Sequence, residues 1–408
     1  MKKLFTRTTL SLVAATAMYA AGYKIPETST NAVALGAANI AHNHHSADAA
    51  YYNPAKMIFM SNKNYIEADL MYVGLEKIDY QGTVRGAAAR ESSESEDFLI
   101  PSFNYVSPKL GQNGVRIGLS VVSPGGLSKR WNGKEAIQTA KEFTLQIVEV
   151  NPTVAFKISD NIGFAVGIRG VYSSGIVKSS AAASRDMSGD NFNVGYNLAV
   201  AYKPTKALEL GVTFRSKVDL DEEGNANLKI GNATVYDGGT NVSIPLPAAL
   251  SLAAAYTFET DTTVEAVYEK TYWSAYQALD FNYVSPISPI LVPYFDDPIA
   301  KHWKDTNTFR LGITQELNNL TLMAGLVIDE TPVPNQTLGF ELPDTDSTSV
   351  SLGGRYQIND RMNIGISGLY SMHKDRTLSA ADQNENGIVG TFSDGNILII
   401  SAGLGYKF

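Results

Sequence analysis

From Asn64 onward, apolar and polar side chains alternate along the chain over long runs. In residues 115–121 the odd positions are Val, Ile, Leu and Val, while the even positions are Arg, Gly and Ser. Residues 162–169, 309–314 and 398–408 follow the same rule. A period of two is typical of strands, because successive side chains point to opposite faces of a sheet. The pattern therefore predicts strands with one apolar face and one polar face.

The alternating strands alone would also fit a soluble β-sandwich. The lengths of the connections between the strands distinguish a membrane barrel from that fold. Short turns are expected at 109–113, 159–161, 203–206, 259–261, 317–319 and 357–361. Long polar loops are expected at 81–97, 124–142, 179–190, 231–239, 283–303, 330–345 and 379–390. Short turns at one end and long loops at the other are typical of outer-membrane barrels, whose short turns face the periplasm. Counting hairpins predicts an all-β fold, a 14-stranded antiparallel transmembrane β-barrel.

Aromatic residues near the strand ends support this fold, although core packing would explain any single one. They are Tyr72, Tyr172, Tyr256, Tyr268, Tyr272 and Trp273, and they fit interfacial girdles. The chain ends in Tyr406-Lys407-Phe408, which looks like the C-terminal signal of outer-membrane barrels. We therefore expect Tyr406 and Phe408 to serve as an assembly signal for the barrel assembly machinery.

The first twenty residues have the plan of a secretory signal peptide: Lys2, Lys3 and Arg7, an apolar stretch, and then small residues. A single anchoring helix is the alternative, but the apolar stretch is too short to span a bilayer. Residues 1–20 are expected to be removed, and the pattern defines the cleavage site to within a residue or two. Export fits the outer membrane of a Gram-negative bacterium as a multi-pass barrel.

Composition narrows the class further. The 408 residues include 18% charged residues and no cysteine, and the formal net charge is -8. This excludes a disordered chain and a disulfide scaffold. No basic block is present that could follow a phosphate backbone, so nucleic acid is not an expected partner.

Residues 21–61 do not alternate and are rich in Ala, Asn and His. Within them Pro54 fixes its own φ and pushes Asn53 toward extended geometry, so Asn53, Pro54 and Ala55 make a rigid corner. Such a corner suits a plug anchored inside a lumen, and a turn of no consequence is the alternative. We expect an N-terminal hatch over 21–61 and the barrel over 62–408.

Several short motifs, in order along the chain, resemble the long-chain fatty acid transporter (FadL) family, which includes the toluene-type hydrocarbon channels. They are Gly22-Tyr23, Asn53-Pro54-Ala55, Pro245-Leu246-Pro247, Trp273-Ser274, 329–334 and Leu342-Pro343-Asp344. The resemblance implies passive uptake of hydrophobic molecules through a 14-stranded barrel that an N-terminal hatch plugs. It also implies that the ligand leaves sideways through a gap in the barrel wall, at a kinked third strand.

Pro101 and Gly118 are the candidates for that lateral opening. Pro101 lies inside the second expected strand, where it donates no ladder hydrogen bond, and Gly118 lies inside the third, where it weakens pairing. A harmless bulge is the alternative for both residues.

Five arginines fall on the polar face of their strands and hence inside the expected barrel: Arg116, Arg169, Arg215, Arg310 and Arg355. Glu209, Glu265 and Glu269 share that face, and salt bridges that rigidify the barrel are one interpretation. The other is that an arginine binds the carboxylate of a fatty acid as a bidentate fork, with Arg169, Arg215 and Arg310 as candidates.

Two further motifs could bind metals, and for both a structural role is favoured. His42, His44, His45 and Asp48 offer suitable donors without a known spacing. Residues 382–387 copy the start of a calcium loop, but Ser393 stands where the loop needs a glutamate. No nucleophile-elbow, zincin or phosphate-loop motif occurs. We therefore expect no metal, no cofactor and no enzyme activity.

The sequence thus predicts a monomeric barrel that passes hydrophobic small molecules by diffusion. Expected partners are a long-chain fatty acid or another hydrophobic ligand, outer membrane lipid, lipopolysaccharide and the barrel assembly machinery. A general porin and a surface adhesin or receptor barrel are the alternatives. Whether the ligand is a fatty acid, an alkane or an arene is open at this point.

Overall fold

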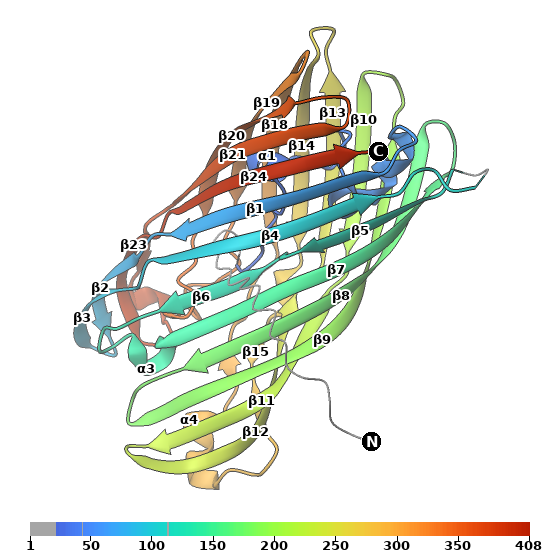
Figure 1. Ribbon diagram of the computed structural model, residues 1–408. Coiled ribbons are helices and arrows are strands. Elements are labelled where there is room, and N and C mark those ends of the chain that lie inside the picture. Colours follow the sequence, from blue (N-terminus) through green and yellow to red (C-terminus); the bar gives the residue numbers. More distant parts are fainter. Residues whose placement is uncertain (1–21, 43, 112–113) are drawn as a thin grey trace, which may run out of the picture.

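The computed structural model describes residues 22–42, 44–111 and 114–408, and it confirms the predicted fold class. The strands form one closed, antiparallel, 14-stranded barrel (Figure 1). Strand β1 (Tyr65–Leu75) pairs with β24 (Ile397–Lys407) from Tyr65↔Lys407 to Leu75↔Ile397, which closes the barrel. The predicted signal peptide, residues 1–20, lies outside the described residues.

Each barrel strand pairs with its neighbours in chain order, and three of the fourteen are formed by two consecutive segments. Between β1 and β24 they are β4 (Glu96–Val106), β5 (Arg116–Val122) continued by β6 (Gly126–Arg130), β7 (Glu142–Lys157), β8 (Ile162–Lys178), β9 (Ala183–Tyr202), β10 (Leu208–Arg215) continued by β11 (Val218–Ile230), β12 (Ala233–Leu246) continued by β13 (Ala249–Thr257), β14 (Thr262–Thr271), β18 (Thr306–Leu317), β19 (Leu320–Asp329), β20 (Ser347–Gln357) and β21 (Met362–His373).

Small elements gather in the long connections, at the lower end of the barrel in Figure 1. They are β2 (Ile78–Val84), β3 (Ala87–Ser92), α3 (Ile137–Ala140), η2 (Trp273–Ala275), β15 (Ala278–Leu279), β16 (Phe281–Tyr283), η3 (Pro289–Leu291), α4 (Val292–Phe295), β17 (Ile299–Ala300), β22 (Arg376–Leu378), η4 (Ala380–Asp382) and β23 (Ile388–Asp394). None of the helices in the described ranges is long and apolar enough to cross a bilayer.

Five of the six predicted short turns are confirmed, and residues 112–113 of the sixth, at 109–113, lie outside the described residues. Two of the predicted long loops are wrong. Residues 183–190 belong to β9 and residues 233–239 belong to β12. These parts of β8–β9 and β11–β12 form long hairpins beyond the apolar belt. Ser, Asp, Thr and Gly dominate both stretches, and isolated buried apolar side chains such as Met187 and Tyr236 are too few to mark them as strands by hydrophobic alternation.

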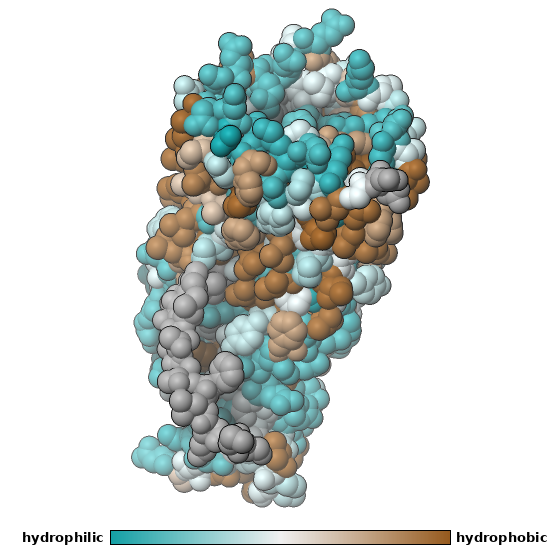
Figure 2. All heavy atoms as spheres, turned by 45° about the vertical axis from the view of Figure 1, so that its right-hand side comes forward, coloured by the Kyte–Doolittle hydropathy of each residue, from teal (hydrophilic) through white to brown (hydrophobic). Residues whose placement is uncertain are grey.

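The outer face of the barrel is apolar, as the alternation predicts. The inner face is polar toward the short turns, whereas toward the long connections inward side chains such as Val73, Ile147 and Ile399 are apolar and buried. Outward side chains such as Ile168, Leu352 and Ile366 are 61%, 70% and 65% exposed. The serines and glycines between outward positions are buried, as in β24. Figure 2 shows apolar side chains across the middle of one face, with hydrophilic side chains gathered toward both ends.

Residues 22–61, the N-terminal segment, pack against the inner faces of the strands. The segment contains α1 (Thr30–Leu35), α2 (Ala49–Tyr52) and η1 (Pro54–Phe59). Helix α1 contacts β18–β21 and β24, whereas η1 contacts β5 and β7–β9 on another part of the wall. Ser29 caps α1 and Gly36 ends it with a left-handed φ of 56°, which turns the chain back across the lumen.

Candidate functional site

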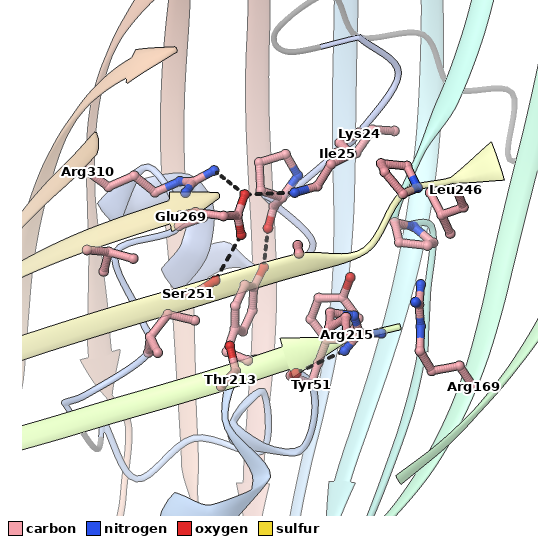
Figure 3. A pocket seen from close by; sticks show the side chains of 18 residues that line it. Lys24, Ile25, Tyr51, Arg169, Thr213, Arg215, Leu246, Ser251, Glu269 and Arg310 are labelled. Atoms are coloured by element: carbon pink, nitrogen blue, oxygen red, sulfur yellow. Dashed lines mark hydrogen bonds and ion pairs between the residues drawn. The ribbon is translucent and has the colours of Figure 1, made fainter. Parts of the chain in front are cut away.

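A pocket in the barrel lumen lies between the N-terminal segment and the wall (Figure 3). It has a volume of about 70 Å³, and Ile25, Ile40, Leu246 and Val267 supply apolar surface. Its charged lining is unequal, with four cations, Lys24, Arg169, Arg215 and Arg310, and one carboxylate, Glu269. The pocket therefore combines apolar walls with an excess of positive charge.

Two of the cations share Glu269. Lys24 Nζ lies 2.7 Å from Glu269 Oε1, and Arg310 Nη2 lies 3.3 Å from the same oxygen. Ser251 Oγ donates to Glu269 Oε2 at 3.0 Å. Arg310 Nε is buried and has no hydrogen-bond partner among the described residues. The Arg310 guanidinium thus keeps donor capacity that its ion pair does not use.

The other two cations share a carboxylate just behind the pocket surface. Arg169 Nε and Nη2 both donate to Glu149 Oε2, at 3.1 and 2.9 Å. Arg215 Nη2 forms an ion pair with Glu149 Oε1, and its guanidinium lies 4.3 Å from the centroid of the Tyr51 ring. This cluster also carries one more positive than negative charge. The side chains that line the pocket and Glu149 thus carry four positive and two negative charges, and the buried carboxyl groups of Glu27 and Asp329 also lie within electrostatic reach of Arg310.

The structure brings Arg169, Arg215 and Arg310 together, although they lie on β8, β10 and β18. Their role as head-group ligands stays a prediction. Each already pairs with a carboxylate, so the salt-bridge interpretation describes part of their role. Lys24 and Glu149 were not among the candidates. Glu149 occupies a polar position between Val148 and Val150, so the alternation alone could have placed it in the lumen.

The barrel wall is interrupted beside this pocket. Strand β4 pairs with β1 along its whole length, but its ladder with β5 covers only Phe103↔Val121 to Val106↔Gly118. Toward the loops, contact resumes where Ser128 Oγ donates to Glu96 Oε2 at 2.6 Å. Between these points β4 and β5 separate, and we call this stretch the wall break.

The start of the N-terminal segment pairs with residues 124–126, between β5 and β6, at the wall break. Ile25 N donates to Pro124 O at 2.9 Å, and Gly126 N donates to Tyr23 O at 2.8 Å. Lys24 forms an isolated bridge with Gly125. Pro124 also lines the lumen pocket, so pocket and wall break adjoin.

Aromatic rings and a loop carboxylate hold Tyr23 and Gly22 in place. The Tyr23 ring centroid lies 4.7 Å from that of Trp273 and 5.6 Å from that of Trp303. Gly22 N donates to Asp344 Oδ2 at 3.3 Å. Burial raises the pKa of Asp344 to about 7, although the Thr331 hydroxyl and the Arg376 guanidinium act in the opposite direction.

Pro101 and Gly118 lie in different surroundings. Pro101 lies on the part of β4 that continues past the β5 ladder, at the wall break. Gly118 lies within the ladder and opposite Thr153 on β7. A Cβ at Gly118 would come 2.9 Å from Ala50 and from Met57 Sδ of the N-terminal segment. Gly118 therefore allows close packing of that segment, and its role in a lateral opening is untested.

Asn53, Pro54 and Ala55 anchor the N-terminal segment. Asn53 Nδ2 donates to Ile40 O at 2.9 Å and to Val200 O of β9 at 3.1 Å. Asn53 Oδ1 accepts from Ala55 N at 3.1 Å and caps η1, which begins at Pro54. The rigid corner is thus fully buried and tied to the wall, while its function as a hatch motif stays a prediction.

Strands near the barrel closure hold the other side of this segment. Thr30 Oγ1 donates to Asp69 Oδ1 of β1 at 2.6 Å and lies 2.9 Å from Ser401 Oγ of β24. Ser367 Oγ of β21 donates to Thr30 O at 2.8 Å. Ser351 Oγ of β20 donates to Ala34 O at 2.8 Å, and Arg355 of the same strand forms an ion pair with Glu67 of β1. Buried hydrogen bonds therefore fix α1 to β1, β20, β21 and β24.

Residues of both metal-like motifs are hydrogen-bonded to neighbouring side chains. Asp48 Oδ2 accepts from Ser29, Asn31 and Asn39 side chains at 2.9–3.1 Å, and His42 Nδ1 lies 2.5 Å from Glu209 Oε2. Asp382 Oδ1 accepts from Asn335 Nδ2 at 2.8 Å. Within the described ranges, no three His, Asp or Glu side chains gather to hold a metal ion.

The C-terminal residues Tyr406 and Phe408 stack with ring centroids 5.5 Å apart, and Phe408 is 50% exposed. Asn64 and Phe408 exchange backbone hydrogen bonds at 2.9 and 3.1 Å, so the end of the chain continues the closing ladder. Their role as an assembly signal stays a prediction.

A closed barrel with an apolar outer face and a charged lumen pocket defines an outer-membrane barrel. The chain belongs to the family described as outer membrane protein transport protein (OMPP1/FadL/TodX), whose model matches residues 11–408. The protein is therefore an outer-membrane transport barrel of a Gram-negative bacterium, as predicted.

Relatives and solved structures agree with this assignment. The "Long-chain fatty acid transport protein" of Escherichia coli K12 is 23% identical, with 91% of this chain and 93% of the relative aligned. "Outer membrane protein P1" of Haemophilus influenzae Rd is 21% identical, covering 89% and 88%. A FadL homologue of Pseudomonas aeruginosa superposes with a TM-score of 0.82 at 19% identity, covering 95% and 99%. The toluene transporter TodX of Pseudomonas putida gives 0.71 at 17%, also covering 95% and 99%.

Proposed function

We propose that this protein carries hydrophobic molecules with an anionic head group, such as long-chain fatty acids, across the outer membrane by diffusion. The observation that carries the proposal is the lumen pocket, in which four cations and one carboxylate face apolar walls. Arginine binds carboxylates as a planar fork, and a buried negative charge needs such a partner. A neutral arene or alkane would leave this positive charge without an added partner. We propose no catalysis, since the family is one of transport proteins.

The N-terminal segment, residues 21–61, acts as a hatch in this proposal. Its first residues pair with residues 124–126 at the wall break, and Lys24 lies in both the pocket and the break. A ligand carboxylate would compete with Glu269 for Lys24 and Arg310. Loss of the Lys24–Glu269 pair would then weaken the hold of residues 23–25 on Pro124 and Gly126. Binding of the head group and opening of the wall are thereby coupled through one side chain.

The ligand leaves through the wall break into the membrane, beside Leu99 and Pro101. Leu99 is 56% exposed on the outer face of β4, so the apolar tail meets an apolar exit. A route into lipid also avoids the transfer of a long alkyl chain into water, which is unfavourable in proportion to its apolar area. Pro101 has no N–H for a ladder bond, which favours separation of β4 from β5.

Uptake into liposomes tests the ligand class. Purified protein in liposomes should take up a labelled long-chain fatty acid faster than the corresponding alkane. Arg310→Gln should lower uptake of the acid by roughly 10- to 150-fold, the effect of losing one charge-assisted contact of roughly 1.5–3 kcal/mol, and should spare the alkane. Lys157→Gln, at the turn end of β7, is the matched control for loss of a cation. Equal losses for acid and alkane in Arg310→Gln would contradict the head-group role.

The route has its own test. A fatty acid with a photoreactive group at its tail should crosslink to Leu99 and Pro101 in the membrane-embedded protein. Crosslinks confined to the turn end of the lumen would show passage to the periplasm instead and would contradict a lateral exit.

We further propose that the barrel functions as a monomer, since β1 and β24 of one chain close it. The barrel assembly machinery would recognise its last strand through Tyr406 and the exposed Phe408. The long connections lie outside the cell in this arrangement, and outer-membrane lipid and lipopolysaccharide surround the belt.

A further inference from the structure

Three carboxyl groups lie around the Arg310 guanidinium at one side of the lumen pocket. Glu269 bonds to both Arg310 and Lys24, which lie on opposite sides of it (Figure 3). Glu27 and Asp329 are both buried and lie within electrostatic reach of Arg310. Three acidic groups and two cations therefore share this part of the lumen. An added ligand carboxylate would enter a place where acidic groups already outnumber the cations.

Of these three carboxyl groups, that of Glu27 is held least firmly. Asp329 Oδ1 accepts from Thr308 Oγ1 at 2.6 Å. Glu269 accepts from Ser251 Oγ at 3.0 Å in addition to its two ion pairs. Glu27 Oε2, in contrast, is buried and has no hydrogen-bond partner among the described residues. Glu27 also belongs to the N-terminal segment, whereas the other two carboxyl groups are fixed on wall strands β14 and β19. Glu27 can therefore change position with the smallest loss of hydrogen bonds.

The unused polar atoms of Glu27 and Arg310 are complementary but not joined. Arg310 Nε keeps an unused N–H, just as Glu27 Oε2 keeps an unused acceptor. A carboxylate that binds a guanidinium as a fork uses two parallel N–H groups. Two carboxylates beside one cation repel each other. A ligand carboxylate therefore gains the fork contact with Arg310 most readily when Glu27 has moved away.

We propose that Glu27 is a specificity-determining residue, whose carboxylate shares the positive charge of Arg310 until a ligand carboxylate replaces it there. The inference rests on the head-group role proposed above for the lumen pocket, and it names the residue that limits that role. Glu27 lowers the affinity for an acid and leaves the affinity for a neutral amphiphile of the same length unchanged. Such a limit suits transport by diffusion, because a site on the route must also release what it binds.

Equilibrium binding of labelled palmitate and labelled hexadecanol to the purified full-length protein in detergent micelles tests this role. Glu27→Gln removes the charge and keeps the size of the side chain, so it should raise the affinity for palmitate about tenfold, a change typical of coupled neighbouring groups. The affinity for hexadecanol, which carries no charge, should stay the same.

Glu222→Gln is the matched control. Glu222 of β11 is also buried and has one oxygen without a partner among the described residues. The charged group within its electrostatic reach is Asp190, not Arg310. This variant should bind palmitate like the unchanged protein. Heat-modifiable mobility on gels shows that each variant is folded.

A double-mutant cycle with Arg310→Gln separates an effect through Arg310 from a general effect of charge. In the Arg310→Gln background, Glu27→Gln should change the affinity for palmitate by less than about twofold. An equal gain in both backgrounds would overturn the proposal. So would an unchanged affinity for palmitate in folded Glu27→Gln, or an equal gain for hexadecanol.

A failure of the proposed function gives a different result. If the unchanged protein and Arg310→Gln bind palmitate equally, the head-group role of Arg310 is wrong and this inference is wrong with it. If Arg310→Gln binds palmitate more weakly but Glu27→Gln binds it like the unchanged protein, the inference about Glu27 alone is wrong.

Discussion

The two sides of the N-terminal segment meet the barrel wall in contrasting ways. Where α1 lies against β1, β20, β21 and β24, buried polar groups of the segment and the wall satisfy one another, as between Thr30 and Asp69, while the unpartnered hydroxyls of Ser347 and Ser371 lie nearer the long connections. On the middle of β4, β5 and β7, the buried side chains of Asn104, Ser120 and Thr153 have polar atoms without a partner among the described residues. A buried polar group without a hydrogen bond is unfavourable. The closed arrangement is therefore firmly held on one side and weakly held on the other.

The weak side is also the side of the wall break. The ladder between β4 and β5 ends at Phe103↔Val121, one rung from these unpartnered groups. Entry of water or ligand between segment and wall would satisfy Asn104 and Ser120, whereas entry at β20 or β21 would break existing bonds. The comparison indicates that the N-terminal segment stays bound to the wall at α1 and separates from it more easily beside β4 and β5.

The largest expected effect is on the free energy of unfolding, and it compares one arginine on the firmly held side with one on the weakly held side. Arg355→Gln leaves the buried carboxylates Glu67 and Asp69 without their cation, so it should lower the free energy of unfolding by about 3–5 kcal/mol. Arg116→Gln removes hydrogen bonds to the carbonyls of Met57 and Ser61 and should cost about 1–3 kcal/mol. Urea unfolding in lipid vesicles measures both. Equal losses would remove the contrast between the sides.

The next largest effect is expected from replacing one glycine on each side with alanine. A Cβ at Gly353 would come 2.6 Å from those of Ala34 and Ser367, so Gly353→Ala should lower stability by about 1–3 kcal/mol through overpacking. A Cβ at Gly125 would come 2.7 Å from Tyr23 O. Because the segment is weakly held on this side, residues 23–25 should move away from Gly125 instead of straining the core. Gly125→Ala should raise fatty acid uptake several-fold with little loss of stability. A stability loss as large as that of Gly353→Ala, without faster uptake, would contradict this expectation.

Two serines provide a smaller and more direct comparison. Ser367→Ala removes a hydrogen bond to Thr30 O and should cost about 1 kcal/mol. Ser120→Ala removes a buried hydroxyl that has no partner and should be neutral or slightly stabilising. The same unfolding measurement applies. If Ser120→Ala proves the more destabilising, the hydroxyl has a partner and the weak side is misjudged.

The smallest effect concerns pH at the loop end of the weak side. The pKa of Asp344 is raised by burial from 3.8 to about 7. As pH rises, the Asp344 carboxyl therefore ionises at a lower pH when it is exposed to solvent than when it is buried beside Gly22. The state in which Gly22 is docked against Asp344 loses stability relative to the undocked state between about pH 4 and pH 7. Fluorescence of Trp273 and Trp303, which pack on Tyr23, should show weaker docking at pH 8 than at pH 5. Asp344→Asn should abolish this difference, and an unchanged pH profile in that variant would assign it to another group.

The sequence predicts the barrel well because a period of two reports directly which face of a strand meets lipid. It fails at 183–190 and 233–239, where polar residues and glycine dominate and isolated apolar side chains such as Met187 and Tyr236 are too few to show a period of two. The alternation also places Arg169 and Arg310 in the lumen. It does not place them in one pocket, because the face of a residue says nothing about its height in the barrel or its position around the axis.

The wall break shows a similar limit. Pro101 is visible in the sequence, whereas the bond between Ile25 N and Pro124 O joins residues far apart in the chain. Gly118 looked equivalent to Pro101 because both weaken a strand. Its packing against Ala50 and Met57 depends on where the N-terminal segment crosses the lumen, which no local pattern encodes.

Thr30 has a consequence for the order of folding. Its hydroxyl contacts Asp69 of the first strand and Ser401 of the last, across the ladder that joins the two ends of the chain. Contacts of such large sequence separation form late, because the intervening chain must be ordered first. Residues 22–61 must therefore lie inside the barrel before β24 pairs with β1. The hydrogen bonds of Thr30 to both strands form only after that pairing is complete.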